Sequence, residues 1–257
     1  MAHFVATLTP KYTLAARKFL KVVVRLDPAA AAAWSWLADL LASDYLNRWN
    51  EANSKDPKPG EQLLQEAENA VHRALQLAPD LDVAQYANGF VHRAHGNHHA
   101  SLMAFTRAIE LNPNFARAYA QKAAQLVNVG RPEDVPALVD KAIALSPLDP
   151  SLGVFYWIRG RSYFFARAYR ESIPWLEKSI AARPNLWYNR LYLVSAYHWV
   201  GDPRAADVLK EFLGYPAFRG YTLDRVKQDE KANPNDDPFV VNGRAKFHEG
   251  VAASGLK

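Results

Sequence analysis

The chain has 257 residues, is 49% hydrophobic and carries a formal net charge of +5 from 31 basic and 26 acidic residues. This composition is that of a folded protein with a sizeable core, and the absence of cysteine excludes disulfides, thiolate metal sites and cysteine nucleophiles. We expect a cytoplasmic protein with no nucleic-acid or membrane partner, because the charges are interleaved, the N-terminus lacks a secretory signal and no apolar run is long enough to span a membrane.

The first predicted helix covers residues 12–26 and ends in a phrase that recurs along the chain. In this six-residue phrase the first residue is small or β-branched, the second is apolar, the fourth is Leu and the sixth is Pro. The closing proline is Pro28, Pro79, Pro113 or Pro147, and a weaker copy ends at Pro184. Proline ends a helix because the residue before it leaves the α region. The prolines are 51, 34, 34 and 37 residues apart, which predicts a repeated helix pair with a 34-residue period.

The long first interval predicts an insertion, the polar segment 50–60, which we expect to protrude as a loop. The helix with Pro174 is predicted to bend or to start late at that residue. Because the helix at 12–26 has no predicted partner before it, the chain is expected to begin inside a repeat and to be a fragment of a longer protein. The helix pairs predicted after it are 29–48 with 61–78, 81–95 with 98–111, 115–129 with 131–145, 152–166 with 168–182, and 186–200 with 203–213.

Small residues recur at fixed places of the repeat. The eighth place holds Gly89, Ala123 or Gly160, where a small side chain allows the two helices of a pair to cross closely. The fifteenth place holds Gly96 or Gly130, which predicts a left-handed cap that closes the first helix.

These places and their spacing resemble the tetratricopeptide repeat family over roughly residues 12–213. The resemblance implies an all-α fold, a right-handed α-solenoid of antiparallel helix pairs whose first helices line a concave groove. After residue 213 the pattern breaks, and helices near 223–231 and 239–253 are expected to cap the solenoid. The predicted domains are therefore 1–213, with a partial first repeat and five further helix pairs, and 214–257, the C-terminal cap.

A narrower resemblance rests on LNPN at 111–114, LSPLDP at 145–150 and the ending at 247–257. These phrases are similar to the C-terminal repeat regions of bacterial class III adenylate and guanylate cyclases and of winged-helix transcription regulators. The resemblance implies a regulatory region of a bacterial signalling protein. No cyclase catalytic segment and no helix-turn-helix lies in the 257 residues, so we predict no catalytic residue, cofactor or metal for this chain.

The residues predicted to face or border the groove are rich in aromatic and arginine side chains, which dominate binding hot spots. Arg93, Arg117 and Arg161 occur on three consecutive first helices and are expected to form a ladder that faces an acidic partner. The alternative is that the aromatic residues pack between repeats and that each arginine pairs with a glutamate or aspartate of its own repeat. The full set is Trp36, Asp39, Tyr86, Phe90, Arg93, Arg117, Gln121, Asn128, Trp157, Arg161, Phe164, Tyr188, Tyr192 and Trp199.

Two functions remain open at this point. The first is a protein-interaction module that binds a protein or peptide, including an acidic one or a second copy of the chain. The second is a regulatory domain that senses a small anionic or aromatic molecule, which would need a closed apolar pocket. A zinc site at His92, His95, His98 and His99 is not predicted, because the turn at 96–97 divides the group.

Overall fold

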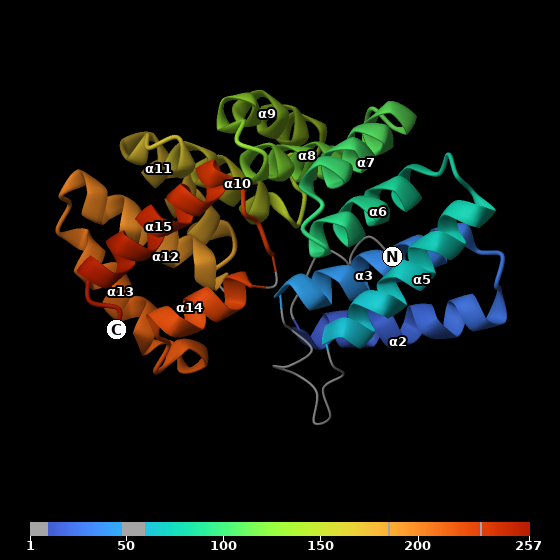
Figure 1. Cartoon of the computed structure of the whole chain (residues 1–257), viewed down its shortest axis with the longest axis horizontal. Coiled ribbons are helices and arrows are strands. Elements are labelled where there is room, and N and C mark those ends of the chain that lie inside the picture. The colour runs from blue at the N-terminus through green and yellow to red at the C-terminus, as the bar shows by residue number, and fades with distance from the viewer. Residues whose placement is uncertain (1–9, 48–59, 185, 232) are drawn as a thin grey trace. The chain divides into compact units, whose positions relative to one another are not determined.

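A computed structural model of the chain describes residues 10–47, 60–184, 186–231 and 233–257, and every regular element in these ranges is a helix (Figure 1). The all-helical architecture predicted from the repeat is confirmed. The helices are α2 (Pro10–Leu26), α3 (Ala31–Asn47), α5 (Gly60–Leu77), α6 (Asp82–Ala94), α7 (His98–Leu111), α8 (Ala116–Asn128), α9 (Val135–Leu145), α10 (Leu152–Phe165), α11 (Tyr169–Ala182), α12 (Trp187–Val200), α13 (Arg204–Gly214), α14 (Leu223–Glu230) and α15 (Pro238–Ala253), with short 3-10 turns at Pro132–Asp134 and Pro216–Phe218.

The prolines explain where the observed helices differ from the predicted ones. α9 begins at Val135 rather than at residue 131, and Pro136 lies in its first turn, where the missing amide hydrogen costs nothing. Pro174 lies inside α11, so that helix does not start late at this residue. The predicted protruding loop falls almost wholly on residues 48–59, outside the described residues, and only its last residue, Gly60, is described, as the start of α5.

The chain divides into two compact units. The first unit contains residues 1–122 and 231–234, and the second contains residues 123–230 and 235–257. α14 and α15, which follow the division predicted at residue 213, belong to the second unit. None of the described helices combines the length and the apolar character needed to cross a membrane.

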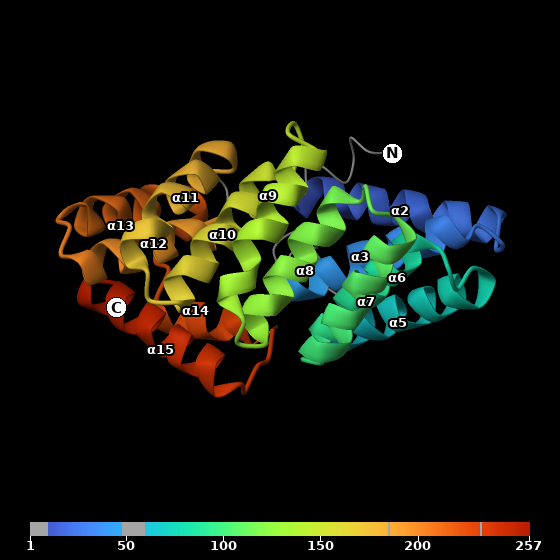
Figure 2. The ribbon, with the colours of Figure 1, turned by 90° about the horizontal axis from the view of Figure 1, so that it is seen from above.

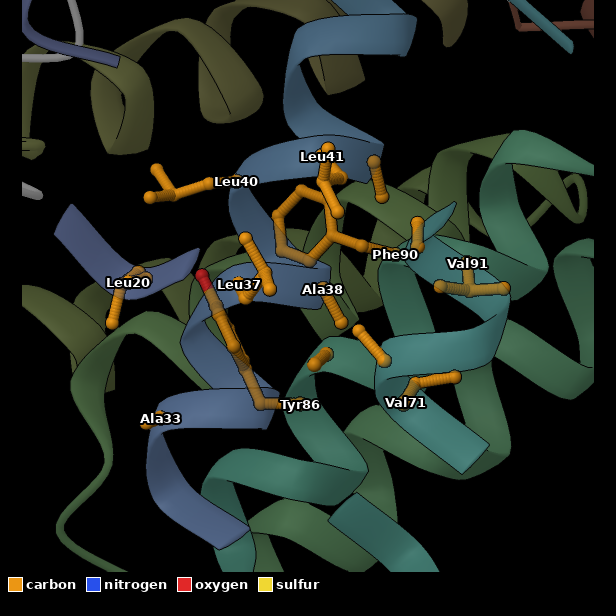
Figure 3. Packing of buried hydrophobic residues seen from close by; sticks show 14 of the residues in the cluster. Leu20, Ala33, Leu37, Ala38, Leu40, Leu41, Val71, Tyr86, Phe90 and Val91 are labelled. Carbon is orange, nitrogen blue, oxygen red and sulfur yellow. The ribbon is translucent and has the colours of Figure 1, made fainter. Parts of the chain in front are cut away.

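The first unit is built around α3, which packs on α2, α5 and α6, while α6 also packs on α7 (Figure 2). Its core is a cluster of alanines, leucines and valines with three aromatic rings, those of Tyr86, Phe90 and Phe105. Figure 3 shows Tyr86 and Phe90 of α6 lying against Leu37 and Leu41 of α3. All four side chains are buried, so these two first helices form the centre of the unit.

The close helix crossings predicted at the eighth place are confirmed in both units. In the first unit, a methyl group added to Gly89 would lie 2.6 Å from the ring of Phe105, so α7 approaches α6 to a distance that only glycine allows. The hydroxyl of Ser101 donates to the carbonyl oxygen of Gly89 across the same crossing at 2.7 Å. The second unit repeats the arrangement, with Ser172 donating to the carbonyl oxygen of Gly160 at 2.7 Å.

The left-handed caps predicted after the first helices are also confirmed. Gly96, Gly130 and Gly201 have φ angles of 73°, 74° and 71°. The equivalent place after α10 holds Arg167, which adopts the same conformation with φ 61°. A residue with a Cβ atom is strained in this region, so the backbone after α10 follows the repeat rather than the preference of its own residue.

The second unit contains two helix pairs, α10 with α11 and α12 with α13, and α15 lies across their first helices. α15 packs along α12 and also contacts α10 (Figures 1 and 2). The C-terminal helix therefore covers part of the face on which the sequence placed binding residues.

Candidate partner-binding site

The predicted binding residues lie on the first helices, as the repeat register requires, and the two units share them. α3 carries Trp36 and Asp39, α6 carries Tyr86, Phe90 and Arg93, and α8 carries Arg117, Gln121 and Asn128; α10 carries Trp157, Arg161 and Phe164, and α12 carries Tyr188, Tyr192 and Trp199. Asn128 and the residues of α10 and α12 belong to the second unit, and the others belong to the first.

In the first unit, Arg117 lies beside two aromatic rings of neighbouring first helices. Its guanidinium carbon is 5.8 Å from the ring centroid of Trp36 and 5.8 Å from that of Tyr86. The two rings are tilted at 60° with centroids 6.4 Å apart. Trp36 and Arg117 are half-buried, whereas Tyr86 is buried, so the outer two side chains form a partly exposed surface supported by the third.

A buried carboxylate stands next to this surface. Asp39 is only 4% exposed, and the hydroxyl of Ser43 donates to its Oδ1 at 3.3 Å. Burial raises the pKa of Asp39 to about 6, while the charge of Arg117 and the bond from Ser43 act in the opposite direction. Burial therefore outweighs the nearby arginine, because removing a carboxylate from water disfavours its charged form.

Two further predicted residues of the first unit, Phe90 and Arg93, make contacts within the unit. Phe90 joins the core, with its ring 5.3 Å from Tyr86 and 5.6 Å from Phe105. Arg93 donates from Nε to Oδ1 of Asn233 at 3.2 Å. Gln121 is half-buried, and its side-chain oxygen has no hydrogen-bond partner among the described residues.

Arg161 of the second unit is internal. It is 5% exposed, donates to Oδ1 of Asn128 at 2.8 Å, and its guanidinium lies 4.6 Å from the ring of Phe165. Burial lowers the pKa of Arg161 and raises the pKa of Tyr192 to about 12. Arg161 therefore does not offer its charge to solvent, and its hydrogen-bond partner is an asparagine of the preceding repeat rather than an acidic residue of its own repeat.

α15 covers aromatic residues of α10 and α12. Phe247 stacks on Tyr192 with ring centroids 4.1 Å apart and planes at 6°, and it meets the edge of Phe164 at 6.5 Å. The indole Nε1 of Trp199 donates to the carbonyl oxygen of Lys246 at 3.0 Å. These three predicted binding residues therefore hold the chain's own C-terminal helix.

A different pair is formed by Trp157 of α10 and Tyr188 of α12. The rings of Trp157 and Tyr188 lie 4.5 Å apart, and both side chains are half-buried. The Nε1 atom of Trp157 is buried and has no hydrogen-bond partner among the described residues. This donor is a polar group that a bound molecule could satisfy.

The covering residues of α15 were not identified from the sequence, although a signal for them exists. Phe239, Gly243, Phe247 and Gly250 are spaced by four, four and three residues, so they share one face of a helix. The two glycines leave no room for a side chain against Phe165 and Ser195. An apolar stripe of alternating aromatic and glycine residues thus indicates a helix that packs closely on a bulky surface.

The four histidines are separated by the turn, as predicted. His98 shares a hydrogen bond of 2.8 Å with the carbonyl oxygen of Pro234, and His95 pairs with Glu68. In the part of the chain that the structure describes, no group of three or more histidine, aspartate or glutamate residues is arranged to hold a metal ion.

Comparisons with known proteins agree with this architecture. No family model matches the chain. A segment of 86 residues, 34% of the chain, is 29% identical to the small glutamine-rich tetratricopeptide repeat-containing protein 2 of Mycosarcoma maydis, and the match spans only 24% of that protein.

Among solved structures, PilW, a widely conserved type IV pilus biogenesis factor, is similar with a TM-score of 0.61 and 17% identity over 85% of this chain and 91% of PilW. PilF of Pseudomonas aeruginosa is similar with a TM-score of 0.52 and 15% identity over 85% of this chain and 90% of PilF. YrrB, a tetratricopeptide protein with an unusual peptide-binding site, is similar with a TM-score of 0.50 and 13% identity over 82% of this chain and 97% of YrrB. The chain therefore has the tetratricopeptide-repeat fold.

Proposed function

We propose that the chain is a non-catalytic interaction module that binds a protein or peptide on the first helices of its first unit, at Trp36 and Arg117. The observation that carries this proposal is the half-buried pair formed by these two residues over the buried ring of Tyr86. Tryptophan and arginine supply a large contact area and a charge with fixed geometry, which is the composition of binding hot spots. The unusual peptide-binding site of the structurally similar YrrB supports a peptide as the ligand class.

The buried carboxylate and the arginine give this surface mixed charge. Asp39 is close enough to influence Arg117 electrostatically, so the surface is not simply cationic. A partner that presents both an aromatic or aliphatic anchor and a carboxylate for Arg117 would match it, since charge-assisted contacts contribute mainly to specificity and association rate.

The test is selection of binding peptides from a random displayed library, followed by affinity measurements with variants. Trp36→Ala and Arg117→Ser should each weaken the selected peptides at least about tenfold, as expected for hot-spot residues. Trp34→Ala is the matched control, because Trp34 is also a half-buried tryptophan of α3 but bonds to the carbonyl oxygen of Pro28. Equal affinity of the selected peptides for wild type, Trp36→Ala and Arg117→Ser would contradict the proposal.

The finer assignment, a regulatory region of a bacterial signalling protein in the cytoplasm, rests on the resemblance of the segments 111–114, 145–150 and 247–257 to cyclase-associated repeats. In such an arrangement the partner would be a neighbouring regulatory or catalytic domain. Binding of an isolated cyclase catalytic domain that is lost in Trp36→Ala would support it, and binding unaffected by that variant would count against it.

A second candidate function, sensing of a small molecule, is supported by one observation. The unsatisfied Nε1 of Trp157 lies in the second unit beside Tyr188 and Arg161, whose guanidinium is 5.6 Å from the Trp157 ring. A small anionic or aromatic ligand that accepts this hydrogen bond should raise the melting temperature of the wild type but not that of Trp157→Phe. A panel of such ligands that shifts both proteins equally would reject this site.

A further inference from the structure

α2 exposes an apolar row where a protein surface is ordinarily polar. Phe19 is 57% exposed, Val22 is 47% exposed and Leu26 is 81% exposed. The opposite face of the helix is buried through Ala16, Leu20 and other residues that pack toward α3. α2 is therefore apolar on two faces, and only one of them is used within the unit.

The repeat register shows that this row is particular to α2. When the closing prolines are aligned, Phe19 corresponds to Ala70 of α5 and Ala104 of α7, both buried alanines in helices paired with a first helix. Val22 corresponds to an exposed arginine in each of these helices, Arg73 and Arg107. The row thus has valine where α5 and α7 have a solvating charge, and phenylalanine where they have a small contact residue.

The spacing of the row is that of a coiled-coil seam. Ala15, Phe19, Val22 and Leu26 follow one another at intervals of four, three and four residues, which places them at alternating a and d positions of a heptad. The neighbouring g positions hold Lys18 and Arg25, both exposed. The geometry points to a helix as the occupant, because such a seam is complementary to the apolar stripe of a second helix.

The charges specify the kind of helix. α2 has no acidic residue, and Lys18 and Arg25 lie along one border of the apolar row. A second copy packed antiparallel would place these cations against their own equivalents, and a parallel copy would place them against the buried side that contains Ala16. We infer that α2 docks an amphipathic helix of a partner protein whose apolar stripe is flanked by glutamate or aspartate.

This surface is separate from the proposed site at Trp36 and Arg117, and it is tested separately. The probe is a synthetic helical peptide of about three heptads with leucine at a and d and glutamate at e and g. Its control replaces every glutamate with lysine. Fluorescence anisotropy should show binding of the acidic peptide to the whole chain, weaker binding as salt is raised, and no comparable binding of the basic peptide.

Variants locate the contact. Phe19→Asp with Leu26→Asp should weaken the acidic peptide at least about tenfold, because both residues lie in the seam. Lys18→Glu with Arg25→Glu should weaken the acidic peptide and strengthen the basic one, a reversal that a loss of folding would not produce. Met103→Asp is the matched control, since Met103 is an exposed apolar residue of α7 (72%) outside the seam, and it should leave the affinity unchanged.

Three outcomes would overturn the inference. The first is equal affinity of wild type and the Phe19→Asp, Leu26→Asp variant for the acidic peptide. The second is binding to vesicles with about one third anionic lipid that depends on these residues while the peptide does not bind, which would assign the row to a membrane surface. The third is a dimer in analytical ultracentrifugation that Phe19→Asp dissociates, which would assign it to a second copy.

Discussion

The ring of Phe247 in α15 lies parallel to the ring of Tyr192 in α12, with centroids 4.1 Å apart and planes inclined by only 6°. This contact joins the C-terminal helix to the first helix of the last repeat, and both rings are buried. Tyr192, which was predicted to contact a partner, therefore anchors the chain's own C-terminal helix.

Replacing Phe247 with alanine should therefore destabilise the second unit by about 3–5 kcal/mol, the cost of removing a fully buried phenylalanine. The measurement is urea unfolding followed by circular dichroism. Val241→Ala on the exposed side of α15 is the control and should change the unfolding free energy by less than about 0.5 kcal/mol. A similar small effect of both variants would mean that α15 is not docked as described.

Gly160 should not tolerate a side chain. A Cβ atom there would lie 2.9 Å from the side chain of Leu176 and 3.2 Å from its backbone nitrogen. Gly160→Leu is expected to cost about 1–3 kcal/mol through overpacking and to lower the melting temperature. Gly214 has no heavy atom within 4 Å of the equivalent point, so Gly214→Ala is the control. Unchanged melting of Gly160→Leu would contradict the close crossing of α10 and α11.

Arg167→Gly should make the protein more stable. Arg167 has φ 61°, a conformation that costs a residue with a Cβ atom about 1–2 kcal/mol, and the equivalent places hold Gly96, Gly130 and Gly201. Part of the gain is offset because glycine has more freedom in the unfolded chain, so the net gain in the unfolding free energy is expected to be up to about 1 kcal/mol. A lower melting temperature for the variant would show that contacts of the arginine side chain outweigh the backbone strain.

Asp39 should make the stability of the first unit depend on pH. Its pKa is raised to about 6 in the folded state from an ordinary value of 3.8, so the folded state holds a proton that the unfolded state releases first. The contribution of the protonated Asp39 to the free energy of unfolding is complete below pH 3.8. It is lost as the pH rises through 6, and the free energy of unfolding falls by about 3 kcal/mol over this range.

The test compares Asp39→Asn with wild type in urea unfolding at about pH 4.5 and about pH 7.5, on either side of the folded-state pKa. Asparagine stays neutral, so its advantage over aspartate should be small at the lower pH and should grow at the higher pH. An equal difference between the two proteins at both pH values would show that the carboxylate is ionised throughout.

The repeat pattern alone determined the helix pairs, their close crossings and the left-handed turns. Proline, glycine and small residues at fixed places act through local sterics, which do not depend on the rest of the fold, and Gly160 and Gly96 are therefore readable from the sequence. The same register placed Trp36, Arg117 and Arg161 on the faces of the first helices.

Which of those faces is open was decided only by the tertiary structure. Arg161 and Tyr192 became internal because α15 and Asn128, which are distant in sequence, lie against them. Phe19 shows the opposite case: its register belongs to a buried contact in α5 and α7, and the structure leaves it exposed. Periodicity specifies the direction in which a side chain leaves its helix. Whether that side chain is buried depends on which segment, distant in the sequence, packs against this face of the helix. A local pattern carries no information about that segment.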